Sequence, residues 1–374
     1  MVSLARKNLL HDRLRFVITI SGVAFAVTLV LVQVGLFMGL LDKATVTIEH
    51  AAADIWITSK ETPNVDFAHG FPETAVLRAR GVRGVARADN LLIQFMNIQL
   101  PSGAEEGVLV YALDDFPAWN LPWRVDEGEV RDLKRGSYIL MDRSAERRFG
   151  PFHVGEHREI LGRRFRIIGT TSEAASFTPA PIVFMSFGNA QELLQNIRGK
   201  THYVLVKLEP AANARAVAAA LRWRLPYNDV YTKAEWARRS RSYWVVSTGL
   251  GMNMGVTVFL GVLVGIVVVA QTLYTSAVEH VKEFGTVKAI GGSNWDIYRI
   301  LGEQALIAAV VGFLRGGAIS WGMRPLMAKL YLNVLVSPGF AGAVFMGTVL
   351  MCLGAAMLSF RRVASIDPAL VFRT

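Results

Sequence analysis

The sequence predicts an α-helical membrane protein with four transmembrane helices and a mixed α/β extracytoplasmic domain between the first and the second. Two observations on the 374-residue chain support this fold class: 52% of its residues are hydrophobic and only 19% are charged, and the apolar residues gather in four long runs. A soluble domain usually has about 25% charged residues. Runs of this kind suit the hydrocarbon core of a bilayer, which a helix crosses in about 20 residues.

The four runs are predicted to span the membrane. The first is free of charge, and its apolar part is too long for a cleavable signal peptide. The predicted spans are residues 16–41, 245–274, 304–323 and 340–360, with an outer loop at 324–339. The single cysteine, Cys352, lies in the fourth span, which excludes a disulfide framework within the chain.

Lysine and arginine residues beside the spans predict the orientation. They gather before the first span, between the second and third, and after the fourth, whereas the short outer loop carries Arg324 and Lys329. The positive-inside rule therefore places both termini in the cytoplasm. We expect a cytoplasmic amphipathic helix over 1–15, a cytoplasmic coupling segment over 275–303 and a cytoplasmic tail over 361–374.

The formal net charge of +10 indicates anionic lipids as partners rather than nucleic acid. Basic residues beside a membrane are attracted to anionic headgroups. The sequence contains no basic run interleaved with stacking aromatic residues and no nucleic-acid-binding motif. We therefore expect no nucleic acid among the partners.

Residues 42–244 should form the extracytoplasmic α/β domain. Strand-like runs rich in β-branched and aromatic residues occur with two helix-like segments. The predicted strands are 54–58, 92–100, 107–111, 164–168, 181–185 and 202–208, and the predicted helices are 189–197 and 211–224. A further helix should begin at Thr232, which forms a capping box with Glu235. We expect it to run straight into the second span, as a rigid rod between domain and membrane.

Glycines four residues apart occur in the spans, and this spacing allows helix backbones to approach closely in lipid. The second span has Gly251 with Gly255 and Gly261 with Gly265, and similar pairs occur in the first and third spans. Two interpretations remain open. These glycines serve either packing between helices of one subunit or a dimer interface between two copies.

Arg315 interrupts the third span and is, with Glu303, an intramembrane candidate. A central arginine costs about 2.5–3.5 kcal/mol on insertion scales, so it is a functional candidate by default. Glu303 lies about three turns away, too far for a direct pair on a straight helix. Gly316 and Gly317 are expected to break the helix and let water or carbonyl groups reach the guanidinium. A gating role and a structural role both remain open.

No pattern predicts a catalytic, cofactor-binding or metal site. His153 and His157 have the spacing of an inverted zinc-protease motif, but Gly155 and the strand-like flanks predict a turn rather than the helix that such a site needs. The Gly-Lys-Thr at 199–201 resembles the end of a phosphate-binding loop, yet Leu194 stands where that loop requires glycine. The protein is therefore not expected to be an enzyme, and ATP hydrolysis would need a separate partner subunit.

One cytoplasmic segment is predicted to dock a soluble motor. After the second span, an amphipathic stretch is followed by two glycines that end a short helix. The residues predicted to make this coupling contact are Lys282, Glu283, Phe284, Gly285, Val287, Lys288, Ala289 and Gly291.

The segment 282–292 resembles the cytoplasmic coupling element of the FtsX-like/MacB-type ABC transporter permease superfamily. The N-terminal residues 4–10, the tail at 361–370 and the order of one span, a large outer domain and three spans are similar as well. The stretches 138–184 and 243–312 look closest to the DevC branch.

The resemblance implies the permease subunit of an ABC-type mechanotransmission exporter in the bacterial inner membrane. Two copies would form a homodimer over a dimer of separate ABC ATPases. The outer domain, a MacB-type periplasmic core, would contact a periplasmic adaptor (membrane fusion protein) in a tripartite efflux complex with an outer-membrane channel. Closure of the ATPases would press on the coupling helix, and the second span would transmit the movement outward.

A function from another class would use the same mechanics. An FtsX-like transmembrane signalling permease would activate a periplasmic hydrolase without transport. A sensor that binds a ligand outside and reports inside is disfavoured, because the sequence shows no cytoplasmic output domain. The signalling alternative keeps the predicted contact with an ATPase.

We predict that Glu283→Lys and Phe284→Asp each abolish co-purification of the ATPase. The first reverses a charge in the predicted docking helix, and the second puts a charge on its apolar face. Affinity purification from detergent extracts, followed by mass spectrometry, measures the loss against the unsubstituted protein. Survival of the complex in both variants would contradict the docking assignment.

Overall fold

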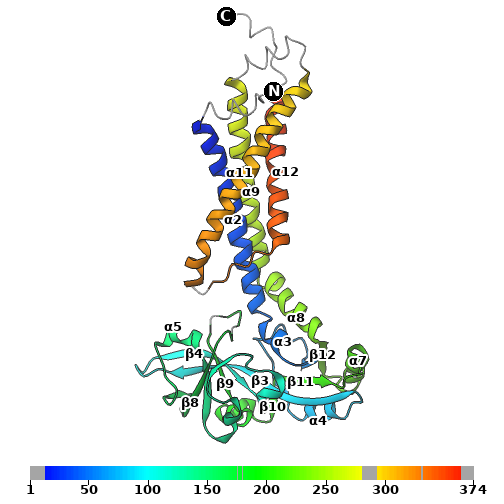
Figure 1. The fold of residues 1–374 in the computed structure, drawn as a ribbon. Helices are drawn as coiled ribbons and strands as arrows, with labels where there is room; N and C mark the ends of the chain where they lie inside the picture. The colour runs from blue at the N-terminus through cyan, green and yellow to red at the C-terminus, as the bar shows by residue number, and fades with distance from the viewer. Residues whose placement is uncertain (1–12, 175, 179, 280–292, 330–331, 364–374) are drawn as a thin grey trace, which may run out of the picture. The chain divides into compact units, whose positions relative to one another are not determined.

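The computed structural model describes residues 13–174, 176–178, 180–279, 293–329 and 332–363. The chain divides into two compact units (Figure 1). One unit is helical and comprises Met1–Leu40 with Leu250–Thr374, and the other, Leu41–Gly249, is a mixed α/β domain. The described residues include four helices long and apolar enough to cross a membrane. The predicted fold class is therefore confirmed.

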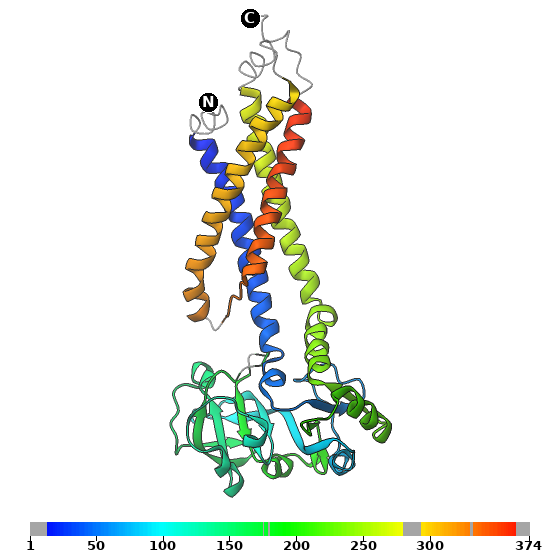
Figure 2. The ribbon, with the colours of Figure 1, turned by 45° about the vertical axis from the view of Figure 1, so that its right-hand side comes forward.

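The helical unit is built from four long helices that run side by side in Figures 1 and 2. They are α2 (Arg13–Lys43), α9 (Leu250–Glu279), α11 (Asn294–Lys329) and α12 (Pro338–Val363). Their buried side chains are almost all small or aliphatic, and they form one apolar core. Its members are Val23, Val27, Leu31, Val269, Leu273, Ala305, Ala309, Met351, Cys352, Ala355 and Ala356.

Glycines allow α2 and α11 to approach closely. A Cβ atom at Gly312 would lie 2.4 Å from Cγ1 of Val23, and one at Gly316 would lie 2.7 Å from the carbonyl oxygen of Ala24. The hydroxyl of Thr28 donates to the carbonyl oxygen of Gly316 at 3.1 Å. This pair thus serves packing within the subunit, as small residues spaced by four do in membrane helices.

The predicted break at Gly316 and Gly317 is wrong, because α11 is one continuous helix from Asn294 to Lys329. Glycine weakens a helix by only about 1 kcal/mol relative to alanine, and packing offsets a cost of this size. Gly316 is therefore placed for contact with α2 and does not open the backbone around Arg315.

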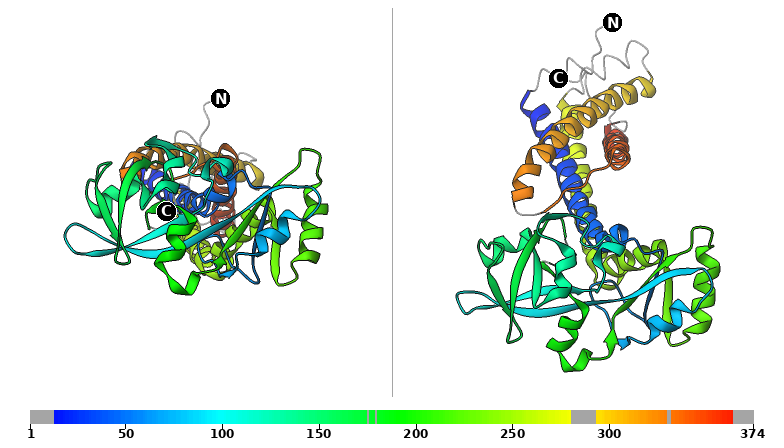
Figure 3. Two further views of the ribbon diagram at one scale, coloured as in Figure 1. Left: turned by 90° about the horizontal axis from the view of Figure 1, so that it is seen from below. Right: turned by 60° about the horizontal axis from the view of Figure 1, so that its bottom comes forward.

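The α/β domain is organised around one ten-stranded sheet in the order β12-β1-β11-β3-β4-β9-β6-β8-β5, with β7 pairing both β3 and β8; β2 and β10 form a separate pair. The strands are β1 (Ile55–Ser59), β2 (Phe71–Pro72), β3 (Val85–Gln99), β4 (Glu105–Ala112), β5 (Val125–Glu127), β6 (Tyr138–Asp142), β7 (His157–Ile160), β8 (Arg163–Thr171), β9 (Ile182–Met185), β10 (Lys200–Thr201), β11 (Tyr203–Leu208) and β12 (Asn228–Thr232). The long strand β3 joins the two halves of the sheet (Figure 3), since its first part pairs with β11 and its second part with β4.

Helices cover both faces of the β12-β1-β11 part of this sheet. The alternation of a strand sends Ile55 and Ile57 to one face and Trp56 to the other. The isoleucines pack in a cluster with residues of α4 (Ala75–Arg80) and α7 (Ala214–Arg224). Trp56 packs in a cluster with α3 (Val46–His50) and α8 (Lys233–Ser242). A third cluster holds α5 (Glu146–Phe149) and α6 (Phe187–Leu193) on the other half of the domain.

All six predicted strands are present as β1, β3, β4, β8, β9 and β11. The predicted helices are shorter than expected. The first corresponds to α6, which ends at Leu193 before a 3-10 turn over Gln195–Ile197, and the second begins at Ala214 because the side chain of Asn213 caps it.

The expected rod from Thr232 into the second span is wrong. Helix α8 passes into a π-helical turn over Tyr243–Ser247, and α9 begins only at Leu250. Gly249 between them has φ +71°, in the left-handed region, where glycine carries no steric penalty. Thr248 and Gly249 therefore form a joint in the chain.

Candidate functional site at helix α8

Helix α8 begins at a complete capping box. The hydroxyl of Thr232 accepts a hydrogen bond from the backbone N–H of Glu235 at 3.4 Å, and the Glu235 carboxylate accepts one from the Thr232 N–H at 2.9 Å. This second bond is the main reason that the pKa of Glu235 is lowered. Next to the cap, Lys233 donates from its backbone N–H to Asp54 at 2.9 Å and from Nζ to the carbonyl oxygen of Ala51 at 2.8 Å. The helix start is thus fixed to the edge of β1.

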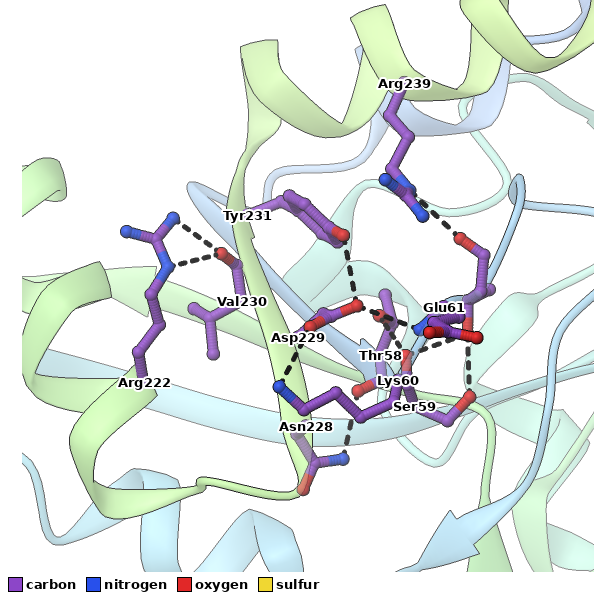
Figure 4. A network of polar contacts seen from close by, with 11 residues as sticks. Thr58, Ser59, Lys60, Glu61, Arg222, Asn228, Asp229, Val230, Tyr231 and Arg239 are labelled. Carbon is purple, nitrogen blue, oxygen red and sulfur yellow. Dashed lines mark hydrogen bonds and ion pairs between the residues drawn. The ribbon is translucent and has the colours of Figure 1, made fainter.

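A stack of side chains holds the next turn of α8 on the sheet edge, and Figure 4 shows two of its members, Tyr231 and Arg239. The fully buried ring of Trp236 stacks on Tyr231 of β12, with 5.3 Å between ring centroids and 18° between planes. The guanidinium of Arg239 lies 5.5 Å from the centroid of the same Tyr231 ring. The Tyr231 hydroxyl donates to Asp229 at 3.2 Å, and Asp229 also accepts from the backbone N–H of Glu61 at 3.0 Å.

The segment that follows β1 is hydrogen-bonded to the same helix. Nε of Arg239 donates to the carbonyl oxygen of Thr62 at 3.2 Å, and the hydroxyl of Ser240 accepts from the N–H of Val65 at 3.1 Å. From the other side, the Tyr203 hydroxyl on β11 donates to the carbonyl oxygen of Val65 at 2.9 Å. Residues 62–65 therefore form a backbone bridge between α8 and the sheet.

Arg241 connects the last turn of α8 to α3, the first helix of the chain after α2. It is paired with the carboxylate of Glu49 and donates to the hydroxyl of Thr45 at 3.0 Å. The Thr45 hydroxyl also bonds Glu49 at 3.0 Å. Since α3 lies where the chain enters the domain and α8 where it leaves, this triad ties the two connections together.

An aromatic cluster surrounds the π-helical turn after α8. Trp244 is buried and stacks on Phe177, with ring centroids 3.7 Å apart and planes at 17°. Phe67 lies 5.8 Å from Trp244 and 6.3 Å from Tyr243, and it also contacts Phe95 on β3 at 6.0 Å. Rings at these distances and angles attract one another beyond their burial. The cluster holds the final residues of the domain against two loops and a strand.

Asp66 places a buried carboxyl group beside this cluster. Its side chain is 3% exposed, and neither carboxylate oxygen has a hydrogen-bond partner in the part of the chain that the structure describes. Burial raises the pKa of Asp66 to about 6, and Ser176 moderates the shift without reaching hydrogen-bond geometry. The pKa of Tyr203 is raised by its own burial first and by the charge of Asp66 second. With a pKa of about 6, the Asp66 carboxyl group is expected to change charge in weakly acidic solution.

Two family models match the chain. One, the MacB-like periplasmic core domain, matches residues 16–222, which is more than half of the chain. The other, the FtsX-like permease C-terminal domain, matches residues 255–368. The chain belongs to the MacB/FtsX type of ABC transporter permeases. As a multi-pass ABC transporter permease, it works with an ABC ATPase partner.

Relatives match the permease over its whole length. An uncharacterized ABC transporter permease of Mycobacterium tuberculosis is 24% identical over 384 residues, covering 100% of this chain and 99% of its own. A second uncharacterized ABC transporter permease of that species is 26% identical over 369 residues, covering 96% and 95%. The periplasmic region of MacB from Actinobacillus actinomycetemcomitans aligns with a TM-score of 0.40 at 9% identity, covering 50% of this chain and 92% of that one.

The predicted coupling residues of the permease lie outside the described residues, so their role stays a prediction. They are Lys282, Glu283, Phe284, Gly285, Val287, Lys288, Ala289 and Gly291. Of the intramembrane candidates, Glu303 is paired with Arg299 at 3.5 Å on the same helix. Arg315 is exposed on α11, and no hydrogen bond or ion pair to it occurs among the described residues.

The glycines of the second span divide into two groups. A Cβ atom at Gly261 would lie 2.9 Å from Leu29 on α2, and one at Gly265 would lie 3.1 Å from Ala26, so both serve packing within the subunit. Gly255 is exposed, with no atom within 4 Å of such a Cβ. Gly251 is half-buried. Gly255 and its neighbour on the same face, Gly251, therefore remain candidates for a dimer interface.

The two histidines of the motif do not lie on a common helix. His153 lies in a loop, and His157 begins β7. No group of three or more histidine, cysteine, aspartate or glutamate side chains is placed to hold a metal ion among the residues described. As the turn-like sequence indicates, the helical geometry that the zinc motif needs is not formed here.

Sequence reasoning identified the cap of α8 but missed most of its anchorage. Arg241 pairs with Glu49 across 192 residues, and Trp244 stacks on a loop residue, Phe177. No local pattern links such partners. The only available signal was the density of arginine and aromatic residues between 231 and 244.

Asp66 generates a pH prediction. Because its folded pKa, about 6, exceeds the ordinary value of 3.8, the folded state holds this proton more tightly than the unfolded state. Stability should therefore fall as the pH rises from about 4 to about 6 and then level off. The loss amounts to about 3 kcal/mol. Asp66→Asn should remove this decline, as measured by thermal unfolding of the full chain in detergent across that range.

Asp115→Asn supplies a control of opposite sign. The hydrogen bond from Arg87 lowers the pKa of Asp115, so this carboxylate contributes stability at neutral pH that is lost as the pH falls. The substitution should lower the melting temperature at neutral pH and leave it unaltered in acid. If Asp66→Asn kept the decline between about pH 4 and about pH 6, the assignment to Asp66 would be wrong.

Proposed function

We propose that the permease is the mechanotransmission subunit of an ABC-type exporter. It couples ATP hydrolysis by the separate ATPase to movement of the extracytoplasmic domain. The observation that carries this proposal is the multiple anchorage of α8, which directly precedes the second span in the chain. A helix fixed to the sheet by a cap, a buried tryptophan and backbone bridges moves with the domain as one body.

The joint at Thr248 and Gly249 is the point at which the proposed coupling passes between α9 and the anchored helix. It lies between an anchored helix and a membrane-spanning helix, and the π-helical turn before it is held by Trp244. Short π-helical segments often occur at functional positions. A joint of two residues lets the direction of α9 change while the anchored part stays on the sheet. In the proposed mechanism, movement of α9 is transmitted to the domain by way of this joint.

The rest of the proposed assembly follows the resemblance of the sequence. Two permeases form a homodimer with a dimer of ATPases in the bacterial inner membrane, with both termini cytoplasmic. The segment around Glu283 and Phe284 docks on the ATPases, and Gly251 and Gly255 lie at the permease interface. The outer domain contacts a periplasmic adaptor in a tripartite efflux complex with an outer-membrane channel.

Arg241→Glu should uncouple the outer domain from ATP hydrolysis, because the new carboxylate repels Glu49. The native pair is about two-fifths exposed on each side chain, and such pairs contribute about 0–1 kcal/mol, so the fold should persist. A spin label at the exposed Ser102, in a Cys352→Ala background, reports the distance between the two copies. ATP should change this distance in the parent protein and not in Arg241→Glu.

The charge-swapped protein with Glu49→Arg and Arg241→Glu is the matched control, since it restores the attraction with the signs exchanged. It should recover the ATP-dependent change. Arg238→Glu, which alters an exposed residue on the same helix, should leave the change intact. An unaltered response in Arg241→Glu would refute transmission through the contact between α8 and α3. Co-purification of an adaptor in mild detergent would separate export from control of a periplasmic hydrolase.

A further inference from the structure

Arg315 is exposed on the surface of α11, beside the face that packs on the neighbouring helices. Gly312 and Gly316 lie against α2, and Phe313 packs on Phe345 of α12 with 5.1 Å between ring centroids. Consecutive residues of a helix are about 100° apart, so Arg315 lies about 160° around the helix from Phe313 and beside the face that Gly312 and Gly316 present to α2. It lies on the outer face of the subunit, where it is exposed and has no partner among the described residues.

The position of Arg315 along α11 is deep in the membrane. Glu303 precedes it by 12 residues and Arg324 follows it by 9, which at 1.5 Å per residue gives about 18 Å and about 14 Å along the axis. Helical side chains lean toward the N-terminal end of the helix, which here is the farther boundary. The guanidinium is therefore costly within the hydrocarbon region, and a bound anion would lower that cost.

A second copy of the chain cannot supply that anion from its own spans. The runs 16–41, 245–274, 304–323 and 340–360 contain no aspartate and no glutamate. Two copies meeting at this face would place two guanidinium groups together, and like charges in a low dielectric repel strongly. The apolar runs of a second copy therefore offer no anionic partner to Arg315.

The surroundings of Arg315 suit a molecule with an anionic head and apolar chains. Leu314 is 63% exposed and Ile319 is 51% exposed, and both flank the arginine on the outer face. Two turns beyond, Gly322 leaves open space where a side chain would stand. A guanidinium binds phosphate or carboxylate oxygens with two parallel hydrogen bonds, which a lysine cannot do.

We propose that Arg315 and the adjoining face of α11 bind the anionic headgroup of a membrane amphiphile. Its apolar chains lie along Leu314 and Ile319. Bound in this way, the headgroup is drawn below the membrane surface by local thinning of the bilayer. The binding site stands on these observations alone. That the amphiphile is also exported cargo rests on the proposed function.

The test uses the full permease in nanodiscs of phosphatidylcholine with a minor fraction of phosphatidylglycerol. Native mass spectrometry counts the phosphatidylglycerol molecules that stay bound after detergent release. A charge-assisted hydrogen bond of ordinary strength predicts about tenfold weaker retention in Arg315→Gln. Arg315→Lys keeps the positive charge but cannot form two parallel hydrogen bonds. Its retention of phosphatidylglycerol should therefore lie between that of the parent protein and that of Arg315→Gln. Retention by Arg315→Gln equal to that of the parent protein would overturn the proposal.

Arg324→Gln is the matched control, because it removes a cation at the end of the same helix. The guanidinium of Arg324 lies 4.3 Å from the centroid of the Trp321 ring. Substitution of Arg324 should therefore leave the retention of phosphatidylglycerol unchanged. A photo-crosslinker at Ile319 identifies the occupant directly. Adducts with phosphatidylglycerol support the proposal, and adducts confined to a second permease or another protein chain would overturn it. The spin-label experiment is independent, so a failed coupling test leaves this result standing.

Discussion

The burial of Trp236 against Tyr231 is the contact on which the rest of the α8 anchorage depends. Removing a buried tryptophan side chain typically costs about 3–5 kcal/mol, whereas a half-exposed ion pair contributes about 0–1 kcal/mol. The apolar stack therefore supplies the strength of the anchorage. The charged contacts of Arg239 and Arg241 set the direction of the helix. Within the ten residues of α8, apolar packing thus supplies the strength of the anchorage, and charged contacts set the direction of the helix.

Asp66 is an unfavourable residue in the same region. A buried carboxylate without hydrogen bonds is costly, and the fold tolerates it because the flanking backbone is held by Ser240 and Tyr203. The free-energy cost of burying the Asp66 side chain is greater when its carboxyl group is ionised. The loop bearing Phe67, which contacts Trp244, follows Asp66 directly. An unfavourable charge is thereby placed next to the aromatic cluster that holds the end of the domain.

The sequence predicted the parts whose physics is local. The spans were visible because a bilayer demands long charge-free helices, and strands such as β11 were visible because β-branched residues gather in short runs. The cap at Thr232 was found for the same reason, since both partners lie within four residues. By contrast, β12 and β6 were missed. Asn228 to Thr232 carries a single aliphatic residue, Val230, and becomes a strand only through pairing with β1.

Interruptions of helices were the least predictable feature, and the reason is common to both errors. A glycine predicts a weak point but not whether the helix breaks there. At Gly316 the backbone of α2 fills the space, and the helix continues. At Gly317 no atom lies within 4 Å of the position that a Cβ would occupy, and the helix continues there as well. At Gly249 the surroundings are equally open, but the backbone turns to a left-handed conformation. Open space around a glycine therefore does not by itself break a helix.

The continuity of α11 has a consequence for the charge that it carries. Had the helix broken at Gly316, free carbonyl groups could have solvated Arg315, and no external anion would be needed. Because the glycine instead binds α2, the helix keeps its backbone hydrogen bonds and fixes the rotation of every neighbouring side chain. That rotation leaves Arg315 exposed on the surface of α11. Its charge, which has no partner among the described residues, thus stands beside the face that packs closely on α2.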